Sequence, residues 1–199
     1  MRIRQPGREN LRTLRNSDGR KWIPAGTGSW GDGVAYKALD INLGRPVALK
    51  LLNSRLLEDE PARQRFLREA RAAARVRHPN VASVFHLGSR GREFFYAMEF
   101  VEGQSLAEHI KRHGRLDAKL ALEITAQVAA GLAAIHKEHL VHRDIKSSNI
   151  MLSPKEGGGY VARIIDLGLA KAVEELPKEA VLSHASAFLG TLCHAIRAT

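Results

Sequence analysis

The stretch His142-Arg143-Asp144-Ile145-Lys146-Ser147-Ser148-Asn149 gathers a carboxylate (Asp144), an amine (Lys146) and an amide (Asn149) within six positions. These groups suit phosphoryl transfer, because an Asp accepts a hydroxyl proton, a Lys neutralises charge on the moving phosphoryl group and an Asn oxygen binds Mg²⁺. The stretch lies between two short apolar segments, so we expect it to form a loop. It therefore predicts a catalytic loop for chemistry on phosphate.

Two further segments supply charged groups. Val47-Ala48-Leu49-Lys50 reads as a strand that carries Lys50 among apolar neighbours, where an ammonium needs a partner. Asp166-Leu167-Gly168 follows a second strand-like run; alone, an Asp-x-Gly is an ordinary turn. The simpler interpretation of Lys50 is a solvated surface amine. The apolar neighbours of Lys50 weaken that interpretation, and the Asp-x-Gly gains weight from its place after an apolar strand and in register with the 142–149 loop.

These motifs together resemble those of the protein kinase family. The loop matches H-R-D-x-K-x-x-N, Val47-Ala48-Leu49-Lys50 matches V-A-I-K, and Asp166-Leu167-Gly168 matches D-F-G with Leu in place of Phe. A Lys two positions after the loop Asp is similar to serine/threonine rather than tyrosine kinases. The family's usual Pro at the next position is Ser147 here.

The resemblance implies roles for individual residues. Asp144 would be the catalytic base and Lys146 a contact to the γ-phosphate, while Asn149 and Asp166 would bind Mg²⁺. Lys50 would contact the α- and β-phosphates.

The resemblance also implies that Lys50 pairs with an acidic residue on the following helix. Glu69 is the candidate for that role. Several arginines lie near Glu69 in the sequence, so a local ion pair on the helix is the alternative.

The glycine-rich segment is less regular than the other motifs. Gly26, Gly28 and Gly31 fit G-x-G-x-x-G literally, yet the interval to the strand lysine favours Gly33 as the last glycine. Trp30 then stands where the family has a second glycine. Glycine at that position lets the backbone approach a phosphate, so a bulky side chain departs from the pattern.

By the same resemblance, the strand around Met98 is the segment that contacts adenine, with Met98 as gatekeeper. An ordinary buried strand is the alternative interpretation of this segment. The implied nucleotide-binding residues are Gly28, Gly33, Ala35, Ala48, Lys50, Met98, Glu99, Val101 and Met151.

The pattern of apolar residues predicts an α+β fold. Strand-like alternation runs to Val101 and is interrupted by one helix that begins near Glu60, whereas helical spacing dominates after Gly103. In that second part, Ser105 with Glu108 predicts the capping box of a short helix, and Asp117 is the expected cap of a longer one. Before the sheet, Pro24 is a poor strand-interior residue. Together with this pattern, the resemblance implies a two-lobed, protein kinase-like fold. Its divisions are a basic, disordered leader (1–21), an N-lobe of antiparallel sheet plus one helix (22–103) and an incomplete, mainly helical C-lobe (104–199).

Composition narrows the function classes. Half of the net charge of +10 comes from the first 21 residues, without any base-reading motif, so a solvated leader is favoured over a nucleic-acid interface. The stretch from Leu120 to Ile135 is interrupted by polar residues, so no membrane span is expected. Cys193 is the single cysteine, which favours a cytoplasmic location.

The resemblance ends near Gly190-Thr191, which is similar to part of the family's activation segment. Arg143 suggests control by phosphorylation of that segment, at Ser183, Ser186 or Thr191; an unmodified loop is the alternative. The family's later helices are missing from the sequence. The apolar stripe of the 117–137 helix (Leu120, Ile124, Val128 and Leu132) would then lack partners, so we expect the chain to be unstable alone, partnered or a truncation product.

Two functions follow from these patterns. The first is an ATP- and Mg²⁺-dependent protein kinase that transfers the γ-phosphoryl group to Ser or Thr hydroxyls of a protein substrate. The second is a truncated, catalytically weak kinase-like module that binds nucleotide or a protein partner.

Overall fold

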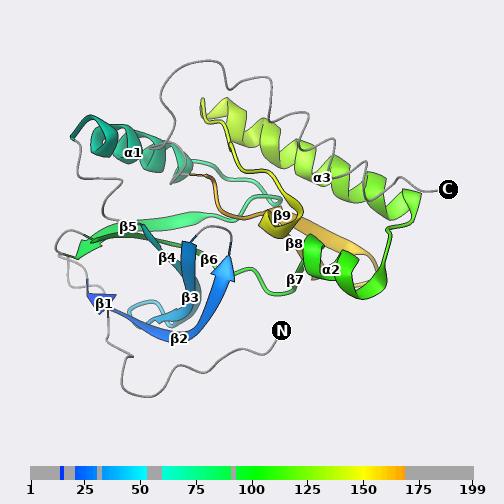
Figure 1. Cartoon of the computed structure of the whole chain (residues 1–199), viewed down its shortest axis with the longest axis horizontal. Coiled ribbons are helices and arrows are strands. Elements are labelled where there is room, and N and C mark those ends of the chain that lie inside the picture. Colours follow the sequence, from blue (N-terminus) through cyan, green and yellow to red (C-terminus); the bar gives the residue numbers. More distant parts are fainter. Residues whose placement is uncertain (1–13, 16–20, 31–32, 53–59, 91–92, 169–199) are drawn as a thin grey trace.

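The computed structural model describes residues 14–15, 21–30, 33–52, 60–90 and 93–168. Figure 1 shows a sheet with helix α1 on one side of the molecule, and helices α2 and α3 with a smaller sheet on the other. The elements, in chain order, are β1 (Leu14–Arg15), β2 (Lys21–Trp30), β3 (Gly33–Asp40), β4 (Arg45–Leu52), α1 (Glu60–Ala73), β5 (Val84–Arg90), β6 (Glu93–Glu99), β7 (Gln104–Ser105), α2 (Leu106–His113), α3 (Ala118–Lys137), a 3₁₀ helix (Ser147–Asn149), β8 (Ile150–Pro154) and β9 (Tyr160–Ile164).

The first part of the molecule is a sheet of strand order β1-β2-β3-β4-β6-β5, with antiparallel pairing throughout. Helix α1 begins at the predicted Glu60-Pro61, where proline is tolerated because the first turn needs no N–H donor. Its buried residues Phe66, Ala70 and Ala73 belong to the main core, and the Phe66 ring packs edge-on against a phenylalanine of β6. The predicted sheet with one helix is therefore present.

The start of the sheet differs from the prediction. Pro24 lies inside β2, and Leu14–Arg15 pair with β2 although both were placed in a disordered leader. Among the described residues, β1 pairs only with residues 21 and 22, so no described strand needs an N–H from Pro24 on that side. The register to β3 also shifts between Pro24 and Gly26, which further favours proline there.

The second part contains a sheet of order β7-β8-β9 and two helices whose caps match the sequence prediction. The Ser105 hydroxyl accepts a hydrogen bond from the Glu108 backbone N–H at 3.1 Å, and the Glu108 carboxylate accepts one from the Ser105 N–H at 3.0 Å. The Asp117 carboxylate likewise caps α3 through the N–H of Leu120 at 3.0 Å.

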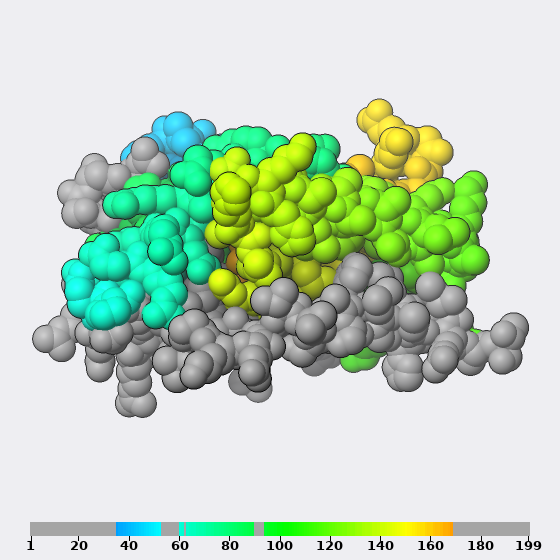
Figure 2. Space-filling model, turned by 90° about the horizontal axis from the view of Figure 1, so that it is seen from above, coloured from blue at the N-terminus to red at the C-terminus, as the bar shows by residue number. Residues whose placement is uncertain are grey.

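Helix α3 packs its apolar stripe against β9. Ile124 and Val128 are fully buried, while Leu120 and Leu132 are half-buried against the same core, so the stripe has partners that the sequence analysis did not foresee. Among the described helices, α3 alone is long and apolar enough to cross a membrane, a test that the core helix of a soluble domain also passes. In Figure 2, α3 lies along one face of the molecule beside α1.

The two parts are joined at the segment 79–83, which lies between α1 and β5. The Asn80 side-chain amide donates to the carbonyl of Ala162 in β9 at 2.8 Å. The N–H of Glu99, at the end of β6, donates to the carbonyl of Ser83 at 2.8 Å. The described chain passes from the first part to the second once, after β6, and this crossing is bonded to the segment that also contacts β9.

Candidate active site

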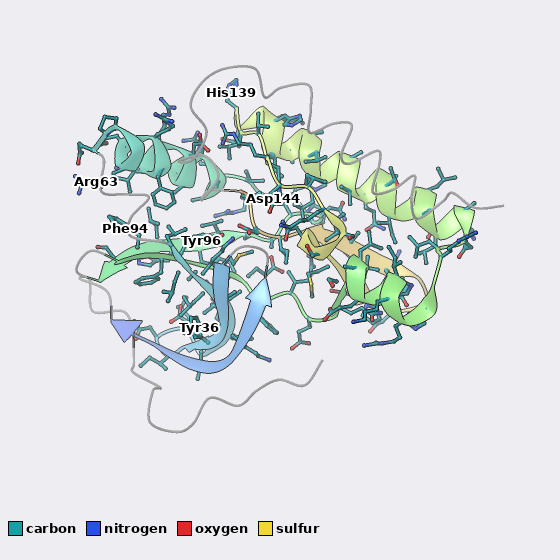
Figure 3. All side chains as sticks on the ribbon, viewed as in Figure 1. Tyr36, Arg63, Phe94, Tyr96, His139 and Asp144 are labelled. Atoms are coloured by element: carbon teal, nitrogen blue, oxygen red, sulfur yellow. The ribbon has the colours of Figure 1, made fainter. Side chains whose placement is uncertain are left out.

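The 142–149 loop brings its three predicted chemical groups together. The Asn149 side-chain amide donates to the backbone carbonyl of Asp144 at 2.9 Å and to its Oδ2 at 3.0 Å. The Lys146 ammonium pairs with the same Oδ2 at 2.9 Å. Asp144 is thus oriented by neighbours from its own loop, and Figure 3 places it where the two parts of the molecule meet.

Asp166 lies directly beside this loop. The N–H of Ile165 donates to the Asn149 carbonyl at 2.9 Å, which fastens the end of β9 to the loop. Asp166 has φ of +60°, a left-handed conformation that is uncommon for residues other than glycine. Gly168 follows with φ of +62°, and a Cβ there would lie 2.0 Å from the His142 carbonyl oxygen. Only glycine fits, so the Asp-Leu-Gly segment is built for close contact with the loop.

Strand β4 delivers Lys50 to Asp166. The Lys50 ammonium forms a buried hydrogen bond and ion pair with Asp166 Oδ2, and only 8% of the Lys50 residue is exposed. Because a buried ammonium needs a partner, this pair accounts for the position of Lys50 and excludes the solvated amine.

The predicted pairing of Lys50 with Glu69 is wrong for this structure. The buried Glu69 carboxylate instead accepts from the Arg143 guanidinium at 2.7 Å. Because Asp166 engages Lys50, Glu69 takes its cation from the catalytic loop. The structure therefore pairs Lys50 with Asp166, and Glu69 with Arg143.

The oxygen atoms of Asn149 and Asp166 suit a divalent cation. Asn149 Oδ1 is buried and accepts no hydrogen bond among the described residues, which is costly unless another group uses it. Mg²⁺ prefers carboxylate and amide oxygens of this kind, so the residues fit the cation that the sequence predicts. No cluster of three His, Cys, Asp or Glu side chains occurs in the described ranges.

The predicted adenine-binding residues lie close to Lys50 in the sheet. Ala48 and Met98 face each other across β4 and β6, and Ala35 faces Lys50 across β3 and β4. Ala48 and Met98 share one buried cluster with Val101 and Met151.

The glycine-rich segment forms the hairpin of β2 and β3. Gly28 pairs with Ala35, and Trp30 pairs with Gly33. The two glycines assigned to phosphate binding therefore lie on paired strands that adjoin Lys50 through Ala35.

His142 is a buried, neutral group next to the acids. Burial lowers its pKa to about 4, despite the opposing effect of Asp166 and other groups. Its Nδ1 accepts from the Asp144 N–H at 3.3 Å, so the ring supports the backbone of the catalytic loop.

A cavity of about 440 Å³ adjoins the Glu69–Arg143 pair rather than Lys50 and Asp166. Its remaining lining residues come from α1 and the segment after α3: Arg68, Arg71, Ala72, Arg75, Glu138, His139 and Leu140. The predicted phosphorylation sites Ser183, Ser186 and Thr191 lie outside the described residues.

Tyr96 is the site residue that the sequence analysis missed. Its hydroxyl donates to Asp166 Oδ1 at 2.7 Å. Its place on the face of β6 that also carries Met98 was the available signal, but alternation alone does not distinguish a core tyrosine from a functional one.

Comparison with known proteins gives consistent results. Residues 24–194 match the protein kinase domain family. A probable serine/threonine-protein kinase of Clostridium acetobutylicum is 37% identical over 148 residues, which are 74% of this chain and 22% of that protein. The serine/threonine-protein kinase PknL of Mycobacterium tuberculosis is 39% identical over 156 residues, covering 78% of this chain and 38% of PknL. The chain thus spans well under half the length of these curated relatives.

Solved structures match the fold. A crystal structure of the M. tuberculosis PknI kinase domain gives a TM-score of 0.72 at 23% identity and covers 92% of this chain and 73% of that one. A second PknI structure gives a TM-score of 0.66 at 26% identity and covers 79% of this chain and 62% of that one. The predicted two-lobed fold is confirmed.

Proposed function

Because this chain belongs to the protein kinase domain family, we propose that it transfers the γ-phosphoryl group of ATP to Ser or Thr hydroxyls of a protein substrate. The curated relatives named above are serine/threonine kinases, which supports this choice of acceptor. We place the activity in the cytoplasm, since the sequence has a single cysteine and so no internal disulfide.

The observation that carries the proposal is the convergence of Lys50, Asp144, Asn149 and Asp166 at the junction of the two parts. Lys50 bonds to Asp166, and Asn149 bonds to both Asp144 and the residue before Asp166. These residues come from distant points of the sequence, and a core built only for stability has no need of so many charged groups.

The proposed reaction assigns one task to each group. Asp144 accepts the proton of the substrate hydroxyl as that oxygen bonds to the γ-phosphorus, and the bond from the γ-phosphorus to the β,γ-bridging oxygen breaks to release ADP. Lys146 neutralises charge on the phosphoryl group during transfer. Asn149 and Asp166 would hold Mg²⁺, which supplies positive charge to the phosphates when bound.

The test is transfer of labelled phosphate from ATP, with Mg²⁺, to a generic protein acceptor. We expect the wild-type chain to label the acceptor and Asp144→Ala to lose about 10²- to 10⁴-fold of the rate, the contribution of a general base. Ser148→Ala, in the same loop, is the matched control and should retain activity. Equal labelling by wild type and Asp144→Ala would contradict the role of Asp144.

A nucleotide-binding module with weak catalysis is the second candidate. It is favoured by the pairing of Lys50 with Asp166 and of Glu69 with Arg143, which occupies groups that transfer would need. ATP binding without detectable labelling by the wild-type chain would support this candidate over the first.

A further inference from the structure

Tyr96 is a polar residue at the centre of the buried face of the sheet. Only 1% of it is exposed, and it belongs to the main core cluster. A buried tyrosine hydroxyl usually finds a hydrogen-bond partner, and here the partner is Asp166 Oδ1. The bond could serve only to give the buried hydroxyl a partner, or it could also orient the Asp166 carboxylate.

Strand register explains how Tyr96 and Lys50 reach the same carboxylate. The two residues are direct partners across β4 and β6, so their side chains emerge from neighbouring strands on one face of the sheet. Lys50 takes Oδ2 of Asp166, and Tyr96 takes Oδ1. Each oxygen of the carboxylate therefore has its own donor, and the carboxylate is held at both atoms.

The geometry of the contact makes Tyr96 the donor. A carboxylate oxygen accepts hydrogen bonds, so the 2.7 Å contact is an O–H of Tyr96 donated to Oδ1.

The backbone of Asp166 makes such a donor useful. Asp166 has a left-handed φ. The residue before it, Ile165, is bonded to the catalytic loop, and Gly168, two residues after it, packs tightly against the same loop. The main chain is thereby fixed, which leaves rotation of the carboxylate as the remaining freedom. A donor on Oδ1 removes that freedom and directs Oδ2 towards a cation, at present the ammonium of Lys50.

We propose that Tyr96 is a positioning residue that orients the Asp166 carboxylate for the Mg²⁺ of bound nucleotide, by holding Oδ1 and leaving Oδ2 to the cation. This inference rests on the proposed function, since it assigns Tyr96 a part in binding the metal–nucleotide complex. It gives the ligands of the second part a positioning residue from the sheet.

The test compares Tyr96→Phe with Tyr36→Phe. Each change removes one phenolic oxygen and keeps the ring; Tyr36 packs against the separate apolar cluster that contains Leu49, and Figure 3 labels both tyrosines. The Kd of ADP is measured by titration calorimetry with and without MgCl₂. The Kd without MgCl₂ divided by the Kd with MgCl₂ gives the coupling of Mg²⁺ to nucleotide.

In Tyr96→Phe we expect this ratio to fall about tenfold while the Kd of ADP without Mg²⁺ stays near the wild-type value, because one hydrogen bond to a charged group is lost. Tyr36→Phe should keep the wild-type ratio. In an Asp166→Asn background, Tyr96→Phe should change the ratio no further, since both changes act through one carboxylate.

The outcomes separate this inference from the function on which it rests. Normal Mg²⁺ coupling in Tyr96→Phe, or an equal loss of ADP affinity with and without Mg²⁺, would overturn the role of Tyr96 and leave the proposed function intact. If Mg²⁺ did not change the affinity of the wild-type chain for ADP, both the role of Tyr96 and the proposed function would be overturned. Thermal unfolding of each variant sets a common temperature at which all of them are folded during titration.

Discussion

The caps of α2 and α3 and the junction between the two parts use polar side chains over very different sequence distances. The Ser105 and Asp117 caps bond to residues three positions away. At the junction, Lys50 bonds to a residue 116 positions away, and Arg143 to one 74 positions away. Caps form as soon as their helix forms, whereas junction contacts exist only when both parts are packed. Breaking a junction contact should therefore cost more, and the predictions below test that ranking.

Asp166→Ala should have the largest effect on stability. It leaves the Lys50 ammonium and the Tyr96 hydroxyl buried without their acceptor, so we expect the free energy of unfolding to fall by about 3–5 kcal/mol. Urea unfolding monitored by circular dichroism measures it. The double variant Lys50→Met/Asp166→Asn should recover most of the loss, because it buries no unpaired charge and its amide oxygen can still accept from Tyr96. A double variant as unstable as Asp166→Ala would contradict this explanation.

His142 should make stability fall in mild acid. Its folded-state pKa of about 4 lies below the ordinary 6.5, so the unfolded chain takes up a proton first as the pH falls. Stability from this group is present above about pH 6.5 and is lost towards pH 4; we expect a loss of about 2 kcal/mol between pH 7 and pH 5. Urea unfolding at the two pH values, compared with His142→Phe, isolates the effect. The same pH dependence in both proteins would refute it.

Glu69→Gln should have an intermediate effect. The amide of Gln can still accept a hydrogen bond from Arg143, but it carries no negative charge. We therefore expect the free energy of unfolding to fall by about 1.5 kcal/mol. A double-mutant cycle with Arg143→Met, followed by urea unfolding, gives the coupling between the two side chains. Additive effects of the two substitutions would show that the pair contributes nothing.

Ser105→Ala should have the smallest effect. Loss of the hydroxyl acceptor and of half the capping box costs about 1 kcal/mol, and the shift in the thermal unfolding midpoint measures it. Asp117→Ala, the matching cap of α3, should behave similarly. If either substitution destabilised the protein more than Glu69→Gln, sequence distance would not be the property that separates caps from junction contacts.

The same contrast explains what the sequence could predict. Caps, the start of α1 and the contacts within the 142–149 loop depend on neighbouring residues, so Ser105, Glu60 and Asp144 were placed correctly. The family resemblance then gathered the distant charged residues at one site. It could not decide whether Lys50 bonds to Asp166 or to Glu69, because that choice depends on how the two parts pack.

The pairing of β1 and the position of Pro24 were also missed. Propensity excludes proline from strand interiors, but here no described strand needs its N–H on the β1 side and the register to β3 shifts beside it. Neither feature is visible in a local pattern. Tyr96 was missed for a related reason, since its role depends on a carboxylate 70 positions away.

The bond between Ser83 and Glu99 has a consequence for motion. The described chain crosses from the first part to the second once, after Glu99, and a 2.8 Å hydrogen bond ties this crossing to the segment before β5 that also bonds to β9. Rotation of the sheet relative to the second part would therefore be smallest near Glu99. It would change the distance between Lys50 and Asp166, because these two residues come from different parts. Entry and departure of a ligand held between them would then depend on the angle through which the sheet turns.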